Sequence, residues 1–385
     1  MFSALQGFNT VTQPSWSITA NEVGAEIATW TSTATPTQTY ILNRQAANAA
    51  TQFRGGCYNP NNQKIYLPPY NAAGNIMVID TVTNTISYPT FGLSGLSTAV
   101  SKYATAVFSP LNGLIYCPPY GTNSVLILDP VANTYTTQTW GFTFSGSDQY
   151  YGALLGTDNK IYALGNTTGN VLIIDPIANT ATQTTFGGVW AGTAYGSFGG
   201  VRSTKNNKMY FAPYARGSWF VIDTSTANAT GNTTTFGVAV PSQAYQGCAQ
   251  DKTGNIVSFA HNATVSTVVN PVANTRVTFA TGSTKVIGHG TGADGNVYGA
   301  PWNNNAAWLF YNATANTITS NNFGNATTGQ WCCGSTVGNG NIYAVPDVGT
   351  ANAVVRILNT NGTGNLNPPL LNTIAGSSFL NGTMV

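Results

Sequence analysis

The sequence predicts an all-β protein, and three observations support this fold class. Apolar and polar residues alternate in short runs such as "KIYLPP" and "NIMVID", and a period of two is typical of β-strands. Clusters of Gly, Asn and Asp interrupt these runs at short intervals, as turns between antiparallel strands require. No long segment shows the helical period of 3.6 residues.

The sequence pattern of one pair of strands is repeated seven times along the chain. A pair of β-forming residues recurs at intervals of 41 to 50 residues, at Ile65-Tyr66, Ile115-Tyr116, Ile161-Tyr162, Met209-Tyr210, Ile256-Val257, Val297-Tyr298 and Ile342-Tyr343. Each pair is followed by an apolar run that ends in Asp or Asn, at Asp80, Asp129, Asp175, Asp223, Asn270, Asn312 and Asn359. Because the two series stay in step, 14 to 17 residues apart, we interpret them as one repeated structural unit.

Each unit is interpreted as four short antiparallel strands, a to d, represented by "GGCYNP", "KIYLPP", "NIMVID" and "TISYPTF". A single unit of this kind cannot bury both of its faces, and repetition around an axis solves the problem. We therefore predict a seven-bladed β-propeller over residues 37–371. Eight blades are the alternative, because residues 37–53 can be interpreted as strands c and d of another blade. Residues 1–36 would serve for attachment or blade closure, and residues 372–385 would form a closing strand or tail.

The repeat resembles the YVTN-type β-propeller repeats, which are related to the NHL and kelch families. The residues that carry the resemblance are the Ile-Tyr pair of strand b, the "VID" that ends strand c, and the "NT" that follows it. The resemblance covers roughly residues 37–371 and implies a propeller fold. It leaves function open, because propellers of this kind occur in surface-layer proteins, lyases, dehydrogenase subunits and viral proteins.

Charge and composition exclude several functions. Only 6% of the 385 residues are charged, and the net charge is +2 with no basic cluster, so we expect no nucleic-acid binding. The apolar runs have the length of strands, and the N-terminus lacks the pattern of a signal peptide. We therefore expect neither membrane insertion nor export through a signal sequence.

The residues that usually carry catalysis or bind metals are few. The five cysteines lack metal-ligand spacing and are interpreted as small buried apolar residues. Most acidic residues lie in repeat turns, where Asp caps the turn through its side chain. The two histidines, His261 and His289, are too few for the histidine sets of propeller lyases, and a structural role is predicted for His289. We thus predict no catalytic residue, no metal and no cofactor.

The antiparallel strand order places the a–b and c–d turns at one end of the ring and the b–c and d–a loops at the other. Aromatic residues gather at the second end, and this end is the predicted recognition surface. One set closes the d–a loops, at Tyr103, Tyr151, Tyr195, Tyr245 and Trp331. The other follows strand b, at Tyr70, Tyr120, Tyr214, His261 and Trp302. The alternative is that these rings only pack between neighbouring blades.

We expect a non-enzymatic structural or interaction protein of a virus or phage particle, located in the virion. One propeller face would bind other virion proteins or a glycan or protein of the host surface. The scarcity of charge and the Thr/Asn/Gly/Ala-rich composition suit a particle protein that resists proteases. A cell-surface or S-layer adhesion propeller is the alternative, and a propeller lyase is a further one.

Overall fold

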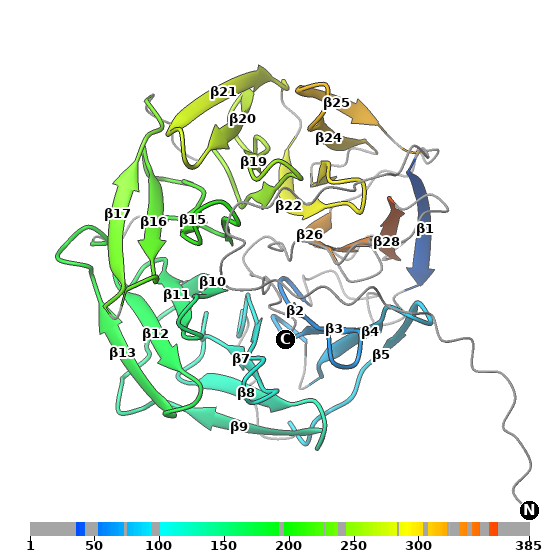
Figure 1. Ribbon diagram of the computed structural model, residues 1–385. Coiled ribbons are helices and arrows are strands. Elements are labelled where there is room, and N and C mark those ends of the chain that lie inside the picture. Colours follow the sequence, from blue (N-terminus) through cyan, green and yellow to red (C-terminus); the bar gives the residue numbers. More distant parts are fainter. Residues whose placement is uncertain are drawn as a thin grey trace, which may run out of the picture.

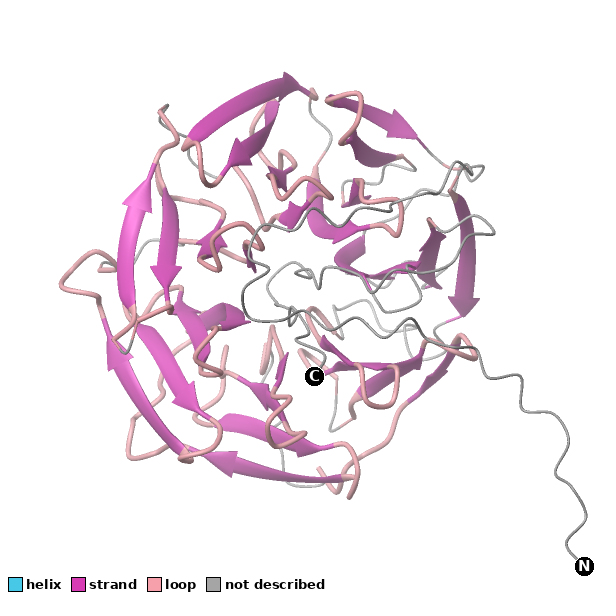
Figure 2. Ribbon diagram, in the orientation of Figure 1, coloured by secondary structure: helices cyan, strands magenta, loops and turns pink. Residues whose placement is uncertain are grey.

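The computed structural model describes residues 36–42, 53–72, 75–93, 101–191, 196–226, 228–237, 244–282, 285–302, 307–321, 323, 331–336, 341–346 and 354–360. These residues form strands, turns and loops, and no helix occurs among them (Figure 2). The strands are arranged as a disc around a central axis, along which Figure 1 is viewed.

The described strands form seven four-stranded sheets, which we call blades and number along the chain. Blade 1 contains β2 (Cys57–Asn59), β3 (Lys64–Leu67), β4 (Met77–Asp80) and β5 (Thr85–Ser87). Blade 2 contains β6 (Val107–Phe108), β7 (Ile115–Cys117), β8 (Val125–Asp129) and β9 (Thr134–Gln138). Blade 3 contains β10 (Tyr150–Leu155), β11 (Ile161–Gly165), β12 (Val171–Asp175) and β13 (Thr180–Thr184). Blade 4 contains β14 (Gly200–Arg202), β15 (Met209–Phe211), β16 (Trp219–Asp223) and β17 (Thr230–Thr234).

The remaining three sheets complete the disc. Blade 5 contains β18 (Ala249–Gln250), β19 (Ile256–Ser258), β20 (Val265–Asn270) and β21 (Thr275–Ala280). Blade 6 contains β22 (Val286–Thr291), β23 (Val297–Pro301), β24 (Trp308–Asn312) and β25 (Thr317–Asn321). Blade 7 contains β26 (Trp331–Thr336), β27 (Asn341–Pro346), β28 (Val354–Asn359) and, from the start of the chain, β1 (Thr37–Leu42).

The blades follow one another around the axis in chain order. Each innermost strand contacts the innermost strand of the next blade, from β2 and β6 through to β22 and β26, and the outermost strands lie at the rim of the disc (Figure 1). Every paired neighbour within a blade is antiparallel. The prediction of an all-β propeller built from four-stranded antiparallel blades is confirmed.

The strand β1 closes the ring. It pairs with β28 from Thr37 opposite Asn359 to Leu42 opposite Val354, and it contacts β5 of blade 1. The segment therefore occupies the outermost position of blade 7 and does not supply the strands of a separate blade, as the alternative interpretation of residues 37–53 required. Residues 372–385, the other segment proposed for closure, lie outside the described residues.

The c–d turns of blades 1, 2, 3, 5 and 6 repeat one geometry, which explains why Asp or Asn ends strand c in these blades. In blade 1, Oδ1 of Asp80 accepts hydrogen bonds from the backbone N–H groups of Val82 and Thr83, both at 3.0 Å. Asn270 makes the same pair of bonds in blade 5, at 3.0 Å each. The Asn of the repeated "NT" has a left-handed backbone, as at Asn84 with φ of 53°, which Asn tolerates better than most residues. The predicted turn-capping role of these acidic residues is confirmed.

The a–b turns contain a second repeated contact, which the sequence analysis missed. An Asn or Asp of the turn bonds the hydroxyl of the strand-b Tyr four residues later. Nδ2 of Asn62 donates to the Tyr66 hydroxyl at 2.8 Å, and the Tyr162 hydroxyl donates to Oδ2 of Asp158 at 2.7 Å. A buried tyrosine hydroxyl needs such a partner, so this contact explains why strand b keeps its Tyr in blades 1, 2, 3, 4 and 6.

The core lies between the blades. In blades 1 to 6 the inner three strands are largely buried, whereas the outermost strand combines exposed and half-buried residues, as β13 and β17 show. Cys57, Cys117 and Cys248 are buried free thiols in this core, which confirms their interpretation as small apolar residues. Burial raises the pKa of the Cys117 thiol well above its usual range.

Candidate functional site

The b–c and d–a loops lie together at one end of the ring, which we call the loop face. A row of backbone hydrogen bonds crosses it from blade to blade. Lys102 N donates to Tyr70 O (2.8 Å), Tyr120 N to Lys102 O (2.9 Å), Gln149 N to Tyr120 O (2.9 Å) and Asn166 N to Gln149 O (2.6 Å). We call the residue four positions after the strand-b Tyr, or after Val257 in blade 5, the rim position, as at Tyr70 after Tyr66. Similar bonds hold the rim positions of blades 4 to 6, which are Tyr214, His261 and Trp302.

Seven rings at or beside the rim positions contact one another in series. This aromatic arc consists of Tyr70, Tyr120, Tyr151, Phe198, Tyr214, His261 and Trp302. Successive ring centroids lie between 4.3 and 6.0 Å apart. The pairs on both sides of Phe198 are edge-to-face, with interplanar angles of 87° and 83°, a geometry that stabilises aromatic pairs. The arc crosses blades 1 to 6 and links them on the loop face.

A β-bulge places Tyr151 in the arc. Tyr150 pairs with Gly165 and Gly152 pairs with Leu164, so Tyr151 is the extra residue of β10. A bulge turns the side chain of its extra residue away from the regular alternation. Tyr150 is fully buried, and its hydroxyl donates to Oδ1 of Asn170 at 2.8 Å. The bulge thus separates two adjacent tyrosines, one packed within blade 3 and one packed in the arc.

The structure separates the predicted site residues into two groups. Five members of the arc were predicted as recognition residues because they follow strand b. Tyr151 was predicted as one because it closes a d–a loop. Tyr103 and Tyr245 belong to the core instead: both are 0% exposed, and each forms a β-bridge to the strand-b end, with Pro119 and Ala260 respectively. Both rings are therefore enclosed in the core. Tyr195 lies outside the described residues, and Trp331 is the first residue of β26.

Phe198, Arg54 and Lys285 belong to this site and were missed from the sequence. Phe198 lies between Tyr151 and Tyr214. The Arg54 guanidinium lies 4.8 Å from the ring centroid of Tyr70 and 5.5 Å from that of Tyr151. Phe198 and Arg54 could have been found by aligning the first strands of the blades. Each occupies the position that Tyr151, the extra residue of the β-bulge, occupies in blade 3.

The accessible part of the site is smaller than the arc. Tyr70, Tyr120, Tyr151, Phe198 and His261 are between 2% and 7% exposed, because their rings cover one another. Tyr214 and Trp302 are half-buried, as are the charged side chains of Arg54, Asp148 and Lys285. The packed rings therefore form a rigid base, and these five half-buried side chains are the groups that a ligand can reach.

Electrostatic effects at the site follow from the burial of the rings. Burial raises the pKa of the Tyr120 hydroxyl above its usual range, and the neighbouring Tyr151, Tyr70 and Asp148 raise it further. Burial also lowers the pKa of the Lys102 ammonium, which donates to the carbonyl of Ala72 at 3.1 Å. Burial likewise raises the pKa of the Tyr214 hydroxyl, so Tyr120 and Tyr214 are neutral groups near neutral pH.

The two histidines have different environments. His289 is 0% exposed in β22 and stacks on Phe259 at a centroid distance of 5.4 Å. Its Nε2 accepts a hydrogen bond from Phe259 N at 3.0 Å, and burial lowers its pKa to about 3. His289 is therefore the neutral structural histidine that was predicted. His261 lies in the arc between Tyr214 and Trp302.

Asn166 occupies the rim position of blade 3, where the other described rim positions have aromatic rings. Its side chain is 1% exposed, and neither Nδ2 nor Oδ1 has a hydrogen-bond partner within the described part of the chain. Oε1 of Gln149, whose carbonyl accepts the Asn166 N–H, is likewise buried without such a partner. A buried amide without partners costs about 1–3 kcal/mol of stability.

We expect the substitution Asn166→Leu to increase the free energy of unfolding by about 1–2 kcal/mol, because it removes these unsatisfied polar atoms without a large change in volume. Urea unfolding of the wild type and the variant measures the difference. A loss of stability of the same size would contradict this prediction, since it would show that the amide is hydrogen-bonded in solution.

Metal binding finds no support in the part of the chain that the structure describes. Within these ranges, no group of three or more His, Cys, Asp or Glu residues could hold a metal ion. Nor do the described residues contain a helix long and apolar enough to cross a membrane.

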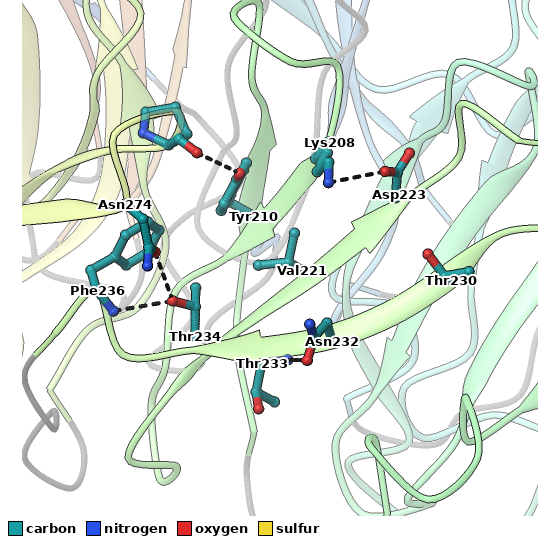
Figure 3. Close-up of a pocket in the computed structure, with 11 residues that line it drawn as sticks. Lys208, Tyr210, Val221, Asp223, Thr230, Asn232, Thr233, Thr234, Phe236 and Asn274 are labelled. Atoms are coloured by element: carbon teal, nitrogen blue, oxygen red, sulfur yellow. Dashed lines mark hydrogen bonds and ion pairs between the residues drawn. The ribbon is translucent and has the colours of Figure 1, made fainter.

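A separate hollow of about 280 Å³ lies at the outer part of blade 4. Its walls come from β15, β16 and β17, with Pro271 and Asn274 of blade 5 (Figure 3). Its polar side chains already bond one another: Nζ of Lys208 lies 3.1 Å from Oδ2 of Asp223, and the Thr234 hydroxyl donates to Oδ1 of Asn274 at 3.1 Å. This hollow is therefore a weaker candidate than the loop face.

Comparison with known proteins supports the fold. No family model matches the chain, and no curated protein matches it. Among solved structures, a catalytically inactive variant of virginiamycin B lyase from Staphylococcus aureus with quinupristin is similar, with a TM-score of 0.66 and 12% identity over 84% of this chain and 99% of that one. A streptogramin B lyase has a TM-score of 0.62 and 12% identity over 86% and 98%. A fungal alcohol oxidase in complex with copper has a TM-score of 0.57 and 11% identity over 84% and 76%. At these identities the likeness shows the β-propeller fold alone.

Proposed function

We propose that this protein is a non-enzymatic recognition propeller that binds a saccharide on its loop face. The observation that carries the proposal is the aromatic arc with its two half-buried rings, Tyr214 and Trp302. A saccharide ring has an apolar C–H face that stacks on Trp or Tyr, and its hydroxyls need nearby donors and acceptors. Arg54, Asp148 and Lys285 supply such groups beside the rings.

Rigidity supports the same proposal. Contacts between rings and bonds between backbone groups hold the rim positions, so little side-chain freedom is lost when a ligand binds. The fold can thereby present a saccharide platform without a deep cavity. The binding energy is expected to come from a few anchoring rings.

A glycan array probed with the intact protein tests this function. We expect a defined set of glycans to be bound, and Trp302→Ala to weaken that binding at least tenfold, which corresponds to about 1.4 kcal/mol. Trp140→Ala is the matched control: this half-buried Trp belongs to the outer part of blade 2, and its Nε1 donates to the carbonyl of Asn179 at 2.9 Å. Absence of binding to any glycan, or equal losses in both variants, would contradict the proposal.

We further propose that the saccharide belongs to a host surface and that the protein is a component of a virus or phage particle. The scarcity of charged residues supports this proposal, since only 13 Lys and Arg residues are available for protease cleavage or repulsion between subunits. Residues 1–36 would then attach the propeller to its neighbours. Detection of the protein in purified particles, and its loss when residues 1–36 are removed, tests this location.

A lyase is the second candidate function, because virginiamycin B lyase and streptogramin B lyase are similar in structure. Of the two histidines, only His261 is placed to act at the loop face, since His289 is enclosed in the core. Incubation with quinupristin distinguishes the two functions. We expect no turnover, and turnover that is lost in His261→Ala would favour the lyase.

A further inference from the structure

Exposed apolar side chains gather at the end of the ring opposite the loop face. This end holds the a–b and c–d turns, and we call it the turn face. Among the described residues, five of the six large apolar side chains that are exposed belong to these turns, at Val82, Leu111, Val131, Ile177 and Val272. The sixth, Val277, belongs to the outer strand β21.

Four of these residues occupy one position of the repeat. We call the second residue after the Asp or Asn that ends strand c the tip residue of its turn. The tip residue is aliphatic in blades 1, 2, 3 and 5, at Val82, Val131, Ile177 and Val272, and these side chains are between 60% and 88% exposed. One exposed aliphatic side chain is ordinary on a protein surface, but its recurrence at one position of four turns requires a reason.

The turn itself does not need an aliphatic tip. The backbone N–H of every tip residue in blades 1 to 6 donates to Oδ1 of the residue that ends strand c, at 2.9 to 3.1 Å. Ser225 in blade 4 and Thr314 in blade 6 make this bond with polar side chains at the tip. The bond fixes the backbone whatever the side chain is, so the reason for an aliphatic tip lies outside the turn.

The tips are held in place by the neighbouring blade as well. The residue just before the tip accepts a hydrogen bond from the a–b turn of the preceding blade. Nδ2 of Asn112 donates to the carbonyl of Pro176 at 3.0 Å, and Nδ2 of Asn206 donates to that of Pro271 at 3.3 Å. A surface built on fixed groups loses little conformational freedom when it associates with a partner.

We propose that two copies of this protein associate through their turn faces, whether or not the loop face binds a saccharide. The four aliphatic tips belong to different blades of the disc (Figure 1), so a peptide or a small ligand contacts only neighbouring tips. A flat partner with the width of the disc contacts all of them at once. A second copy has this width, and its own tips have the same spacing, so the same surface serves on both sides of a two-fold dimer.

Ion pairs beside the tips fit the same partner. Three of them lie at the turn face, with N–O distances of 3.6, 3.6 and 3.1 Å and partly exposed side chains: Lys64–Asp80, Lys160–Asp175 and Lys208–Asp223. Each pair presents both signs of charge, so lysines of one copy can face carboxylates of the other. A partner with a single sign of charge would leave one member of each pair unmatched. In the resulting dimer the two loop faces point in opposite directions and remain accessible.

Sedimentation velocity of the intact chain over a range of concentrations tests the proposal. We expect a reversible equilibrium between monomer and dimer. The variant V82S/V131S/I177S/V272S places at each aliphatic tip the residue type that blade 4 already has at Ser225, so the fold should be kept. We expect this variant to raise the dissociation constant of the dimer at least tenfold, because each substitution acts twice in a two-fold contact.

Val131→Ser and Val277→Ser form a matched pair of single variants. Each removes an exposed valine, but Val277 lies on an outer strand and not in a turn. We expect Val131→Ser to raise the dissociation constant about threefold or more and Val277→Ser to leave it unchanged, and this pair replaces the fourfold variant if that variant does not fold. A wild type that stays monomeric at every concentration, a dimer that the fourfold variant retains, or equal weakening by both single variants would overturn the proposal.

Discussion

A chain that begins at Asn43 is expected to unfold at a much lower urea concentration than a chain that begins at Pro36. The two chains differ only by β1, which forms six residue pairs with β28 and contacts β5 across the junction between the last and the first blade. Each lost backbone bond costs about 0.5–1.5 kcal/mol. The loss of β1 should therefore cost several kcal/mol, and it also opens the ring.

The comparison isolates ring closure from any role of the preceding residues, because both chains lack residues 1–35. Unfolding followed by intrinsic fluorescence gives the two midpoints. Their equality would mean that β1 does not close the propeller in solution, and a different segment would then have to cover β28.

Stability at acid pH is expected to depend strongly on His289. Its folded-state pKa of about 3 lies below its ordinary value of 6.5, so the unfolded chain takes up the proton first as the pH falls. The stabilisation from keeping this histidine neutral is complete above pH 6.5 and is lost progressively between pH 6.5 and 3. At about 1.36 kcal/mol per pH unit, roughly 3 kcal/mol is lost between pH 7 and 4.

The measurement must compare the wild type with His289→Gln, because other buried groups act in the opposite direction. Burial raises the pKa of the carboxyl groups of Asp251 and Asp294, which favours the folded state as the pH falls. Both proteins contain these carboxyl groups, so they cancel in the difference. We expect the wild type to lose its advantage over His289→Gln as the pH falls from 7 to 4. A difference that stays constant over this range would show that His289 is not enclosed.

Local features of the repeat could be predicted because they depend on local chemistry. The Asp or Asn at the end of strand c is explained by the following turn alone. Asp80 and Asn270 each accept hydrogen bonds from two backbone N–H groups of that turn. The apolar character of strands b and c likewise follows from burial on both sides of a blade. Strand positions and turn roles were therefore visible in the sequence.

Features that depend on register or on distant segments could not be predicted in the same way. Tyr150 and Tyr151 are adjacent, and only the bulge in β10 decides which of them packs in the arc. Closure by β1 depends on a pairing between residues more than 300 positions apart, from Thr37 to Asn359. Strand register gives the place of Arg54 within blade 1, but its contact with Tyr151 gives no sequence signal, because the two residues come from different blades.

The aromatic residues show the limit of inference from residue type alone. Tyr103 precedes strand a and Tyr120 follows strand b of the same blade, and both are rings with a polar tip. Tyr103 forms a β-bridge to Pro119 and is wholly enclosed, whereas Tyr120 contacts Tyr70 and Tyr151 in the arc. Alternation along the strand, and not the residue type, decides which ring packs between blades and which faces the site.

Photo-crosslinking with a diazirine-bearing form of a glycan that the array identifies, followed by peptide mass spectrometry, tests most directly where this protein binds its ligand. The account predicts adducts on peptides of the loop face that contain Arg54, Tyr214 or Trp302, and competition by the unmodified glycan should abolish them. Competable adducts confined to the walls of the hollow in blade 4, such as the peptide that contains Asn232 and Phe236, would contradict it.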